Sequence, residues 1–150
     1  MTHDHATVST LNRLIEVCRD GQQGFNTASE GIRDSELKTL FAQYSQQRRT
    51  FAAELEKEVK RLGGDVTNRG TVTGALHHGW NNIKTAVTGK DDGAIISEAE
   101  RGEDIAKAAY QKALGTTLPA GIMSVVQRQS AQVKETHDRI RALEKATQAR

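Results

Sequence analysis

Residues 35–64 read SELKTLFAQYSQQRRTFAAELEKEVKRLGG, and this stretch decides the fold class. Its inward positions recur at the three- to four-residue spacing of a helix. They are Leu37, Phe41, Tyr44, Arg48, Phe51, Leu55, Val59 and Leu62. Asp34 is a suitable N-cap before this stripe, and the pair Gly63-Gly64 is a suitable stop after it. The pattern predicts one long helix from Ser35 to Leu62.

The same spacing predicts a long helix before this one and two after it. The first runs from about Val8 to Glu30, and Gly31 is expected to follow it as a left-handed C′ residue. The third and fourth are expected from a cap at Asp91 or Asp92 to Gly115, and from Pro119 through Leu143. Short connections make the first two helices one antiparallel hairpin and the last two another.

The connection between the hairpins, residues 63–90, is long. Within it Leu76, Trp80, Ile83 and Val87 are spaced for a short amphipathic helix over about Val72 to Val87. Such a segment can carry the chain along the whole length of a bundle, so the third helix can begin at the same end as the second. This topology is that of a ferritin-like four-helix bundle, formed as a single domain by residues 1–150.

Composition narrows the function classes. The 150 residues hold 21 Lys and Arg against 19 Asp and Glu, a net charge of +2 that gives no reason to expect nucleic acid as a partner. Cys18 is the single cysteine, which excludes an internal disulfide and any zinc site with two thiolates. No apolar run approaches the roughly 20 residues of a membrane span. We expect a cytoplasmic protein.

Five segments resemble those of a known family: LNRLIE at 11–16, DGQQGF at 20–25, GTVTGALHHGW at 70–80, ERGED at 100–104 and HDR at 137–139. The sequence is similar to a bacterial ferritin-like four-helix-bundle family of unknown function. His78 stands where an Arg is more usual in that family. The resemblance implies a ferritin-like fold for nearly the whole chain, and it implies no particular reaction.

Several polar residues are expected to face the bundle core. Arg48, Glu103 and His137 lie on the inward stripes of three helices, roughly 15 to 21 Å from the same bundle end. Gln22 and Gln129 complete this predicted network. A buried Arg needs a carboxylate partner, and Glu103 is the best candidate. On the first helix, Glu16 and Asp20 are placed opposite the apolar stripe.

The alternative is a metal site. A ferritin-like di-metal centre needs two Glu-x-x-His motifs, and the chain has none. Arg48 also occupies the position of a ligand, where its charge would repel a cation. A mononuclear site formed by Glu100, Glu103 and His137 remains open, with iron, manganese or zinc as the ion.

The remaining candidates have simpler readings. His77 and His78 beside Trp80 could bind a metal or ligand at the crossover surface, but adjacent histidines point to different faces of a helix. Trp80 is expected to pack against the bundle. Cys18 lies on an apolar stripe and is expected to behave as a small hydrophobic residue.

The sequence therefore predicts no catalytic residue and no cofactor. It favours a bundle that acts without catalysis, as a homo-oligomer or through a protein partner, and leaves the question of an enzyme open. The alternative is a metal-binding ferritin-like protein, for iron handling or of oxidase or peroxidase type, with carboxylate and His ligands inside the bundle.

Overall fold

The computed structural model describes residues 2–66 and 78–148, and all regular structure in these residues is helical. This confirms the expected all-helical class. The helices are α1 (Thr2–Gly31), α2 (Ser35–Arg61), α3 (Ile83–Thr88), α4 (Asp92–Leu114) and α5 (Ala120–Gln148). Among the described residues, no helix combines the length and the apolar character that crossing a membrane requires.

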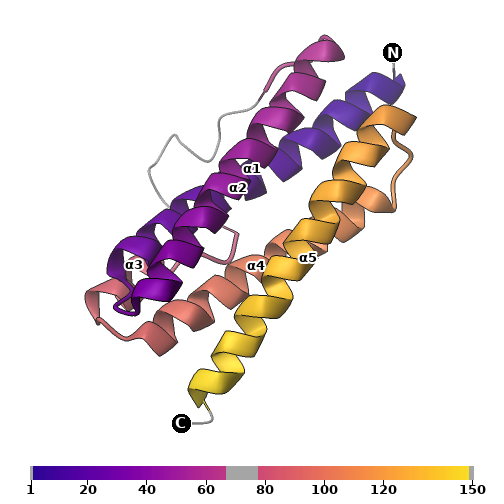
Figure 1. The fold of residues 1–150 in the computed structure, drawn as a ribbon. Helices are drawn as coiled ribbons and strands as arrows, with labels where there is room; N and C mark the ends of the chain where they lie inside the picture. Colours follow the sequence, from indigo (N-terminus) through magenta and orange to yellow (C-terminus); the bar gives the residue numbers. More distant parts are fainter. Residues whose placement is uncertain (1, 67–77, 149–150) are drawn as a thin grey trace.

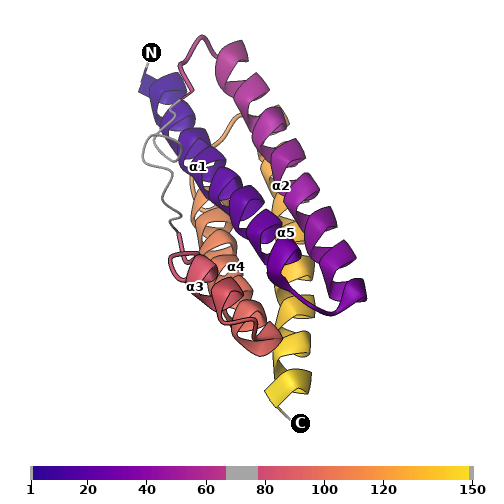
Figure 2. The same cartoon turned by 90° about the vertical axis from the view of Figure 1, so that its left-hand side faces the viewer.

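The four long helices form two antiparallel hairpins that lie side by side (Figures 1 and 2). α1 packs against α2 and α4, α4 packs against α5, and the short α3 lies beside α1 and α4. α2 and α4 run in the same direction, as a long connection between the hairpins requires. The contact between α2 and α5 is slight.

The expected caps are present at both hairpins. The Asp34 carboxylate accepts hydrogen bonds from the Glu36 and Leu37 amides, and Asp91 does the same for Gly93 and Ala94. These bonds satisfy amides that the first helical turn leaves without partners.

At the other end of α2, Gly63 has a φ of 77° and its amide donates to the Lys60 carbonyl at 3.0 Å. A left-handed residue is what a tight helix stop needs, and glycine adopts it without strain. The predicted end of this helix is confirmed.

The predicted boundaries of α1 and α5 need correction. α1 begins at Thr2, six residues before the expected Val8, and Asp4 in its first turn suits the helix dipole. Gly31 is the last residue of α1 and not a left-handed cap. Its role is steric, because a Cβ at Gly31 would lie 2.3 Å from Cγ1 of Val87. Pro119 was expected to be the first residue of the last helix; it directly precedes α5, and its carbonyl accepts from the Met123 amide.

The predicted crossover helix is not continuous. Residues 72–77, with Leu76, lie outside the described residues. Residues 78–82 are not helical, and in the described part of this segment the helix covers Ile83–Thr88. His78 and Gly79 have φ values of 53° and 92°, which a right-handed helix cannot include. The Glu98 carboxylate accepts from the Asn82 amide and so replaces a helical hydrogen bond. Trp80 is buried, with 1 % of its surface exposed, as its spacing predicted.

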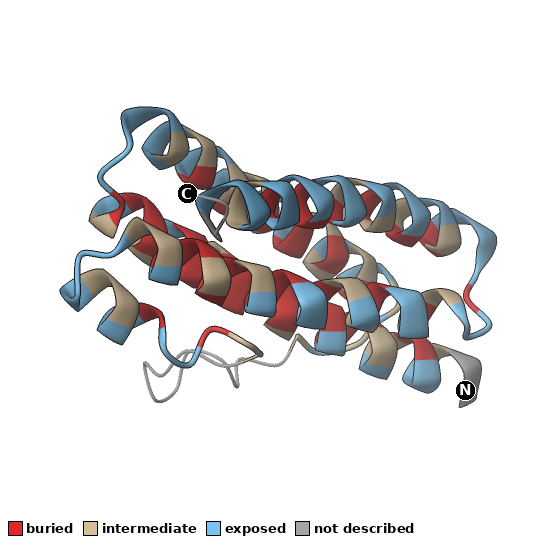
Figure 3. Ribbon diagram, turned by 90° about the horizontal axis from the view of Figure 1, so that it is seen from below, coloured by how far each residue is buried: buried red, intermediate tan, exposed pale blue. Residues whose placement is uncertain are grey.

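Figure 3 shows buried positions on the sides of the helices that face one another, with exposed positions on the outside. The buried apolar side chains form two clusters. The first includes Leu11, Cys18, Phe51, Leu55, Tyr110 and Val133. The second includes Phe25, Phe41, Trp80, Ile95, Ala99 and Ile140. Arg48 and Glu103 are buried polar residues, and they lie between the two clusters along α2 and α4.

Candidate functional site

Arg48 and Glu103 form a buried ion pair between α2 and α4. The two terminal nitrogens of Arg48 donate to the two carboxylate oxygens of Glu103 at 2.5 and 2.6 Å. Arg48 is 1 % exposed and Glu103 is fully buried. This two-bond geometry is the strongest arrangement that Arg and a carboxylate can adopt.

The surroundings keep Arg48 charged. Burial alone lowers the pKa of the guanidinium, but the Glu103 carboxylate outweighs this effect, and the net result is a raised pKa. The Phe25 ring lies 5.4 Å from the guanidinium carbon, and Gln47 accepts from Nε. A Cβ at Gly21 would lie 3.4 Å from the Arg48 side chain, so α1 passes within van der Waals distance of it.

This pair does not fit the di-metal centre of a ferritin-like bundle. Such a centre needs carboxylate oxygens from several helices that are free to bind cations. Both oxygens of Glu103 already accept from Arg48, whose positive charge would oppose a metal ion here. At the centre of the bundle, the charges of Arg48 and Glu103 therefore neutralise each other.

His137 does not join this pair. Its Nε2 lies 2.5 Å from Oδ1 of Asp104, and its Nδ1 lies 3.2 Å from Oδ1 of Asp138. The ring is buried, with 4 % of the side chain exposed, whereas both carboxylates are 58 % exposed. The predicted network of Arg48, Glu103 and His137 is thus divided into a central ion pair and a separate His site facing α4.

Glu100, Asp104 and His137 come together between α4 and α5. One ligand atom from each lies within 4.8 Å of the others. Glu100 and Asp104 are four residues apart and share one face of α4, while α5 presents His137 opposite them. The structure therefore replaces Glu103 of the predicted trio by its neighbour Asp104.

Glu100 has an unusual environment. Its Oε2 is a buried atom that accepts no hydrogen bond among the described residues. The Glu100 carboxyl group also forms a hydrogen bond with the Glu144 carboxylate of α5. Two carboxylates can form such a bond only by sharing a proton. This shared bond, followed by burial, raises the pKa of Glu100 to about 7, and the pKa of Glu144 is lowered.

Asp138 is placed to orient His137. A hydrogen bond from Nδ1 of His137 lowers the pKa of the Asp138 carboxyl. Histidines that bind metals through one ring nitrogen usually donate from the other to a carboxylate or carbonyl, which fixes the tautomer. Here that arrangement would leave Nε2 facing Asp104 and Glu100.

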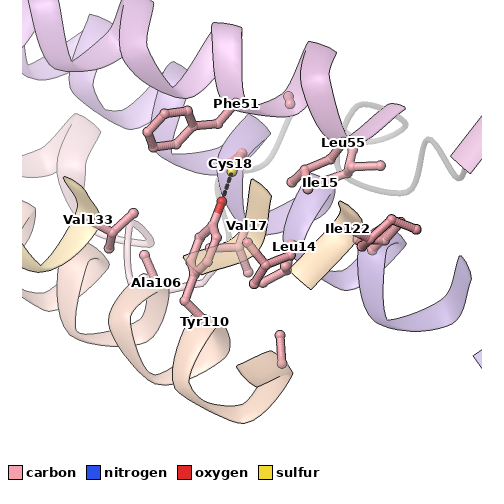
Figure 4. Close-up of a cluster of buried hydrophobic side chains, with 14 of the residues drawn as sticks. Leu14, Ile15, Val17, Cys18, Phe51, Leu55, Ala106, Tyr110, Ile122 and Val133 are labelled. Carbon is pink, nitrogen blue, oxygen red and sulfur yellow. Dashed lines mark hydrogen bonds between the residues drawn. The ribbon is translucent and has the colours of Figure 1, made fainter. Parts of the chain in front are cut away.

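Gln129 belongs to a different set of hydrogen bonds, with residues of the first apolar cluster. Its Oε1 accepts from the Tyr110 hydroxyl at 2.6 Å, and its Nε2 donates to the Phe51 carbonyl. The Cys18 sulfur lies 3.2 Å from the same hydroxyl (Figure 4). Burial raises the pKa of the Cys18 thiol to about 11, which agrees with its predicted role as an unreactive apolar residue.

Gln22 is half-buried, and its backbone carbonyl accepts from the Ser45 hydroxyl at 2.8 Å. It therefore ties α1 to α2 through the main chain. The network that was predicted to include its side chain is not formed as one unit.

Of the two crossover histidines, the structure describes His78, and His77 lies outside the described residues. His78 contacts the Asp20 carboxylate through Nδ1, and Arg13 lies 3.1 Å from its Nε2. The placement of Asp20 opposite the core was wrong, because Asp20 is 1 % exposed, and the chain folds back over it at His78.

Sequence reasoning missed Asp104 and Glu144 as members of the α4–α5 group. The available signal was the i, i+4 spacing of Glu100 and Asp104, together with His137 and Glu144, which lie two turns apart on the last helix. This spacing identifies residues that share one face of a helix. It does not determine which face of α4 meets which face of α5.

Comparisons with known proteins give one result about the family. Residues 6–116, from α1 to just beyond α4, match a family model described as a domain of unknown function, DUF2383. A comparison with curated protein sequences finds no match. The helix α5, which supplies His137 and Glu144, lies beyond the matched segment. Because the match covers well over half of its residues, the chain belongs to the DUF2383 family of domains of unknown function.

Proposed function

We propose that this protein is a ferritin-like helix bundle that binds one divalent transition-metal ion between α4 and α5. The observation that carries the proposal is the convergence of Glu100, Asp104 and His137, whose ligand atoms lie within 4.8 Å of one another. The paired hairpins and the long connection between them support the ferritin-like part of the proposal.

The donor set favours a particular class of ion. One imidazole nitrogen with carboxylate oxygens suits zinc, iron, manganese and similar ions, whereas calcium and magnesium prefer oxygen ligands alone. Ligands of one such ion lie roughly 3 to 4 Å apart, so small side-chain rotations would close this site. Asp104, with 58 % of its side chain exposed, has the freedom to make most of that movement.

Two features of the site fit a ligand role. The buried Oε2 of Glu100 has no hydrogen-bond donor among the described residues, which is costly for a carboxylate and would be relieved by a cation. The contact between His137 and Asp138 supplies the outer partner that metal-binding histidines usually have.

The test is metal binding by the whole chain, purified without a polyhistidine tag and stripped with a chelator. Equilibrium dialysis against Zn²⁺ and against Mn²⁺ should give one ion per chain for at least one of them. The variant Asp104→Asn should bind at least about tenfold more weakly, because it removes one anionic ligand. The exposed change Glu135→Gln, on the same helix as His137, is the matched control and should bind normally. Binding that survives Asp104→Asn and His137→Ala would refute the proposal.

Self-association remains a separate prediction of the sequence. Among the described residues, Ile105 is the exposed large apolar side chain, at 37 %, and a single residue of this kind does not define a docking surface. Light scattering after gel filtration tests the prediction. A mass near twice 16.4 kDa or more would support it, and a monomer at all concentrations would contradict it.

A further inference from the structure

The polar contacts between α4 and the second half of α5 form a short ladder. Asp104 faces His137, Glu100 faces Glu144, and Ser97 donates a hydrogen bond to Glu144. All of these contacts join the same two helices. The candidate metal ligands therefore also contribute polar contacts that hold this half of α5 on α4.

Apolar packing is sparse along the same part of α5. Between residues 138 and 147, Ile140 is buried and Leu143 packs only partly against the second cluster, while most other positions are exposed. The first half of α5 is anchored differently, by buried Ile122, Val126 and Val133. Arg128 and Gln129 add hydrogen bonds to α2 in that first half.

Charged groups of both signs lie along the ladder. The carboxylates are those of Glu100, Asp104, Asp138 and Glu144, and the basic side chains that act on them are His137, Arg101, Lys107, Lys134 and Arg141. A divalent ion bound by Glu100 and Asp104 of α4 and by His137 of α5 would add a direct attraction between the two helices.

From this ladder and its charges, and on the basis of the proposed metal site, we infer that metal occupancy controls how firmly residues 138–147 of α5 dock on α4. The site then acts as a metal-dependent clamp on a helix that lies beyond the family-matched segment. A ligand that binds only the docked form multiplies the ratio of docked to undocked protein by one plus the ratio of its free concentration to its Kd.

The experiment is hydrogen exchange by mass spectrometry on the whole chain, with excess chelator and with Zn²⁺ at about ten times its measured Kd. Amides of residues 140–147 should exchange about tenfold more slowly with Zn²⁺, because the open population falls by that factor. Amides of residues 122–133 should change little and serve as the internal control. The variant Asp104→Asn should lose the Zn²⁺ effect at the same metal concentration.

Each outcome separates the inference from the proposed function. Slower exchange confined to the second half of α5 supports the clamp. One Zn²⁺ bound per chain with unchanged exchange at 140–147 overturns the clamp and leaves the metal site standing. Absence of stoichiometric binding overturns both. A uniform slowing along the whole chain also contradicts the clamp, because it would show global stabilisation only.

Discussion

Arg48 and Glu103 join α2 to α4 by two parallel hydrogen bonds, at the level where the two apolar clusters of the core meet. Each residue satisfies the charge of the other in a site closed to solvent. The pair thus fixes the register of the two hairpins, and it leaves neither carboxylate oxygen of Glu103 free to bind a metal ion.

Loss of Arg48 should therefore be costly. We expect Arg48→Ala to lower the free energy of unfolding by about 3 kcal/mol or more, because it leaves the buried Glu103 without a cation. The double variant Arg48→Met, Glu103→Leu should recover much of this loss, since both charges are removed. Urea unfolding followed by circular dichroism measures both effects.

The matched control is Arg49→Ala, next to Arg48 but on the exposed side of α2, which should change stability by less than about 0.5 kcal/mol. An Arg48→Ala protein with the midpoint of the parent would show that the pair contributes nothing to the fold.

Trp80 should report on the close packing of the crossover. Its ring lies between two glycines, and a Cβ at Gly24 or Gly102 would approach it to 2.2 or 2.3 Å. Gly24→Ala should therefore displace the indole, shift its fluorescence to longer wavelength and destabilise the protein by about 1 to 3 kcal/mol. Gly121→Ala, where nothing lies within 4 Å, should leave both properties unchanged. Parent-like emission from Gly24→Ala would contradict the packing of Trp80 described above.

Cys18 should be unreactive in the folded protein. Its thiol is fully buried, and burial raises its pKa to about 11, so little thiolate exists at pH 8. A thiol-specific chromogenic disulfide reagent should label the native chain no faster than the chain unfolds, and should label one thiol at once in denaturant. Complete labelling of the native protein within the mixing time would show that Cys18 is accessible.

The same thiol should affect stability in alkali. The unfolded chain loses the Cys18 proton from about its ordinary pKa of 9.0, while the folded chain keeps it until about 11. The unfolded state is therefore favoured progressively as pH rises through this interval, and stability falls. In Cys18→Ala this contribution should vanish, so its free energy of unfolding should decline less steeply between pH 9 and 11 than that of the parent. Equal slopes would rule out a titrating Cys18.

The parts of the fold that follow local rules could be predicted from the sequence. The stripe that includes Arg48, the cap at Asp34 and the stop at Gly63 depend on neighbours within one helix, and the structure has all three. The crossover could not be predicted in the same way. At His78 and Gly79 contacts with Asp20 and with α4 determine the backbone, and they override a helical spacing that the side chains alone suggested.

The candidate site shows the same limit. Glu103 and Asp104 are neighbours in sequence, but they point about 100° apart on a helix. Which of them meets His137 depends on how α4 and α5 are rotated against each other, and the apolar stripes do not define that rotation closely enough. The sequence therefore supplied His137 and Glu100, and the packing of the two helices selected Asp104.

The most direct test of the proposed metal site is the position of the ion itself. Crystals of the tag-free protein grown with Zn²⁺ should give one strong anomalous difference peak per chain at the zinc edge, about 2.0 to 2.1 Å from Nε2 of His137 and beside the Glu100 and Asp104 carboxylates. A peak at the centre of the bundle next to Glu103, or no peak within reach of His137 at saturating Zn²⁺, would contradict it.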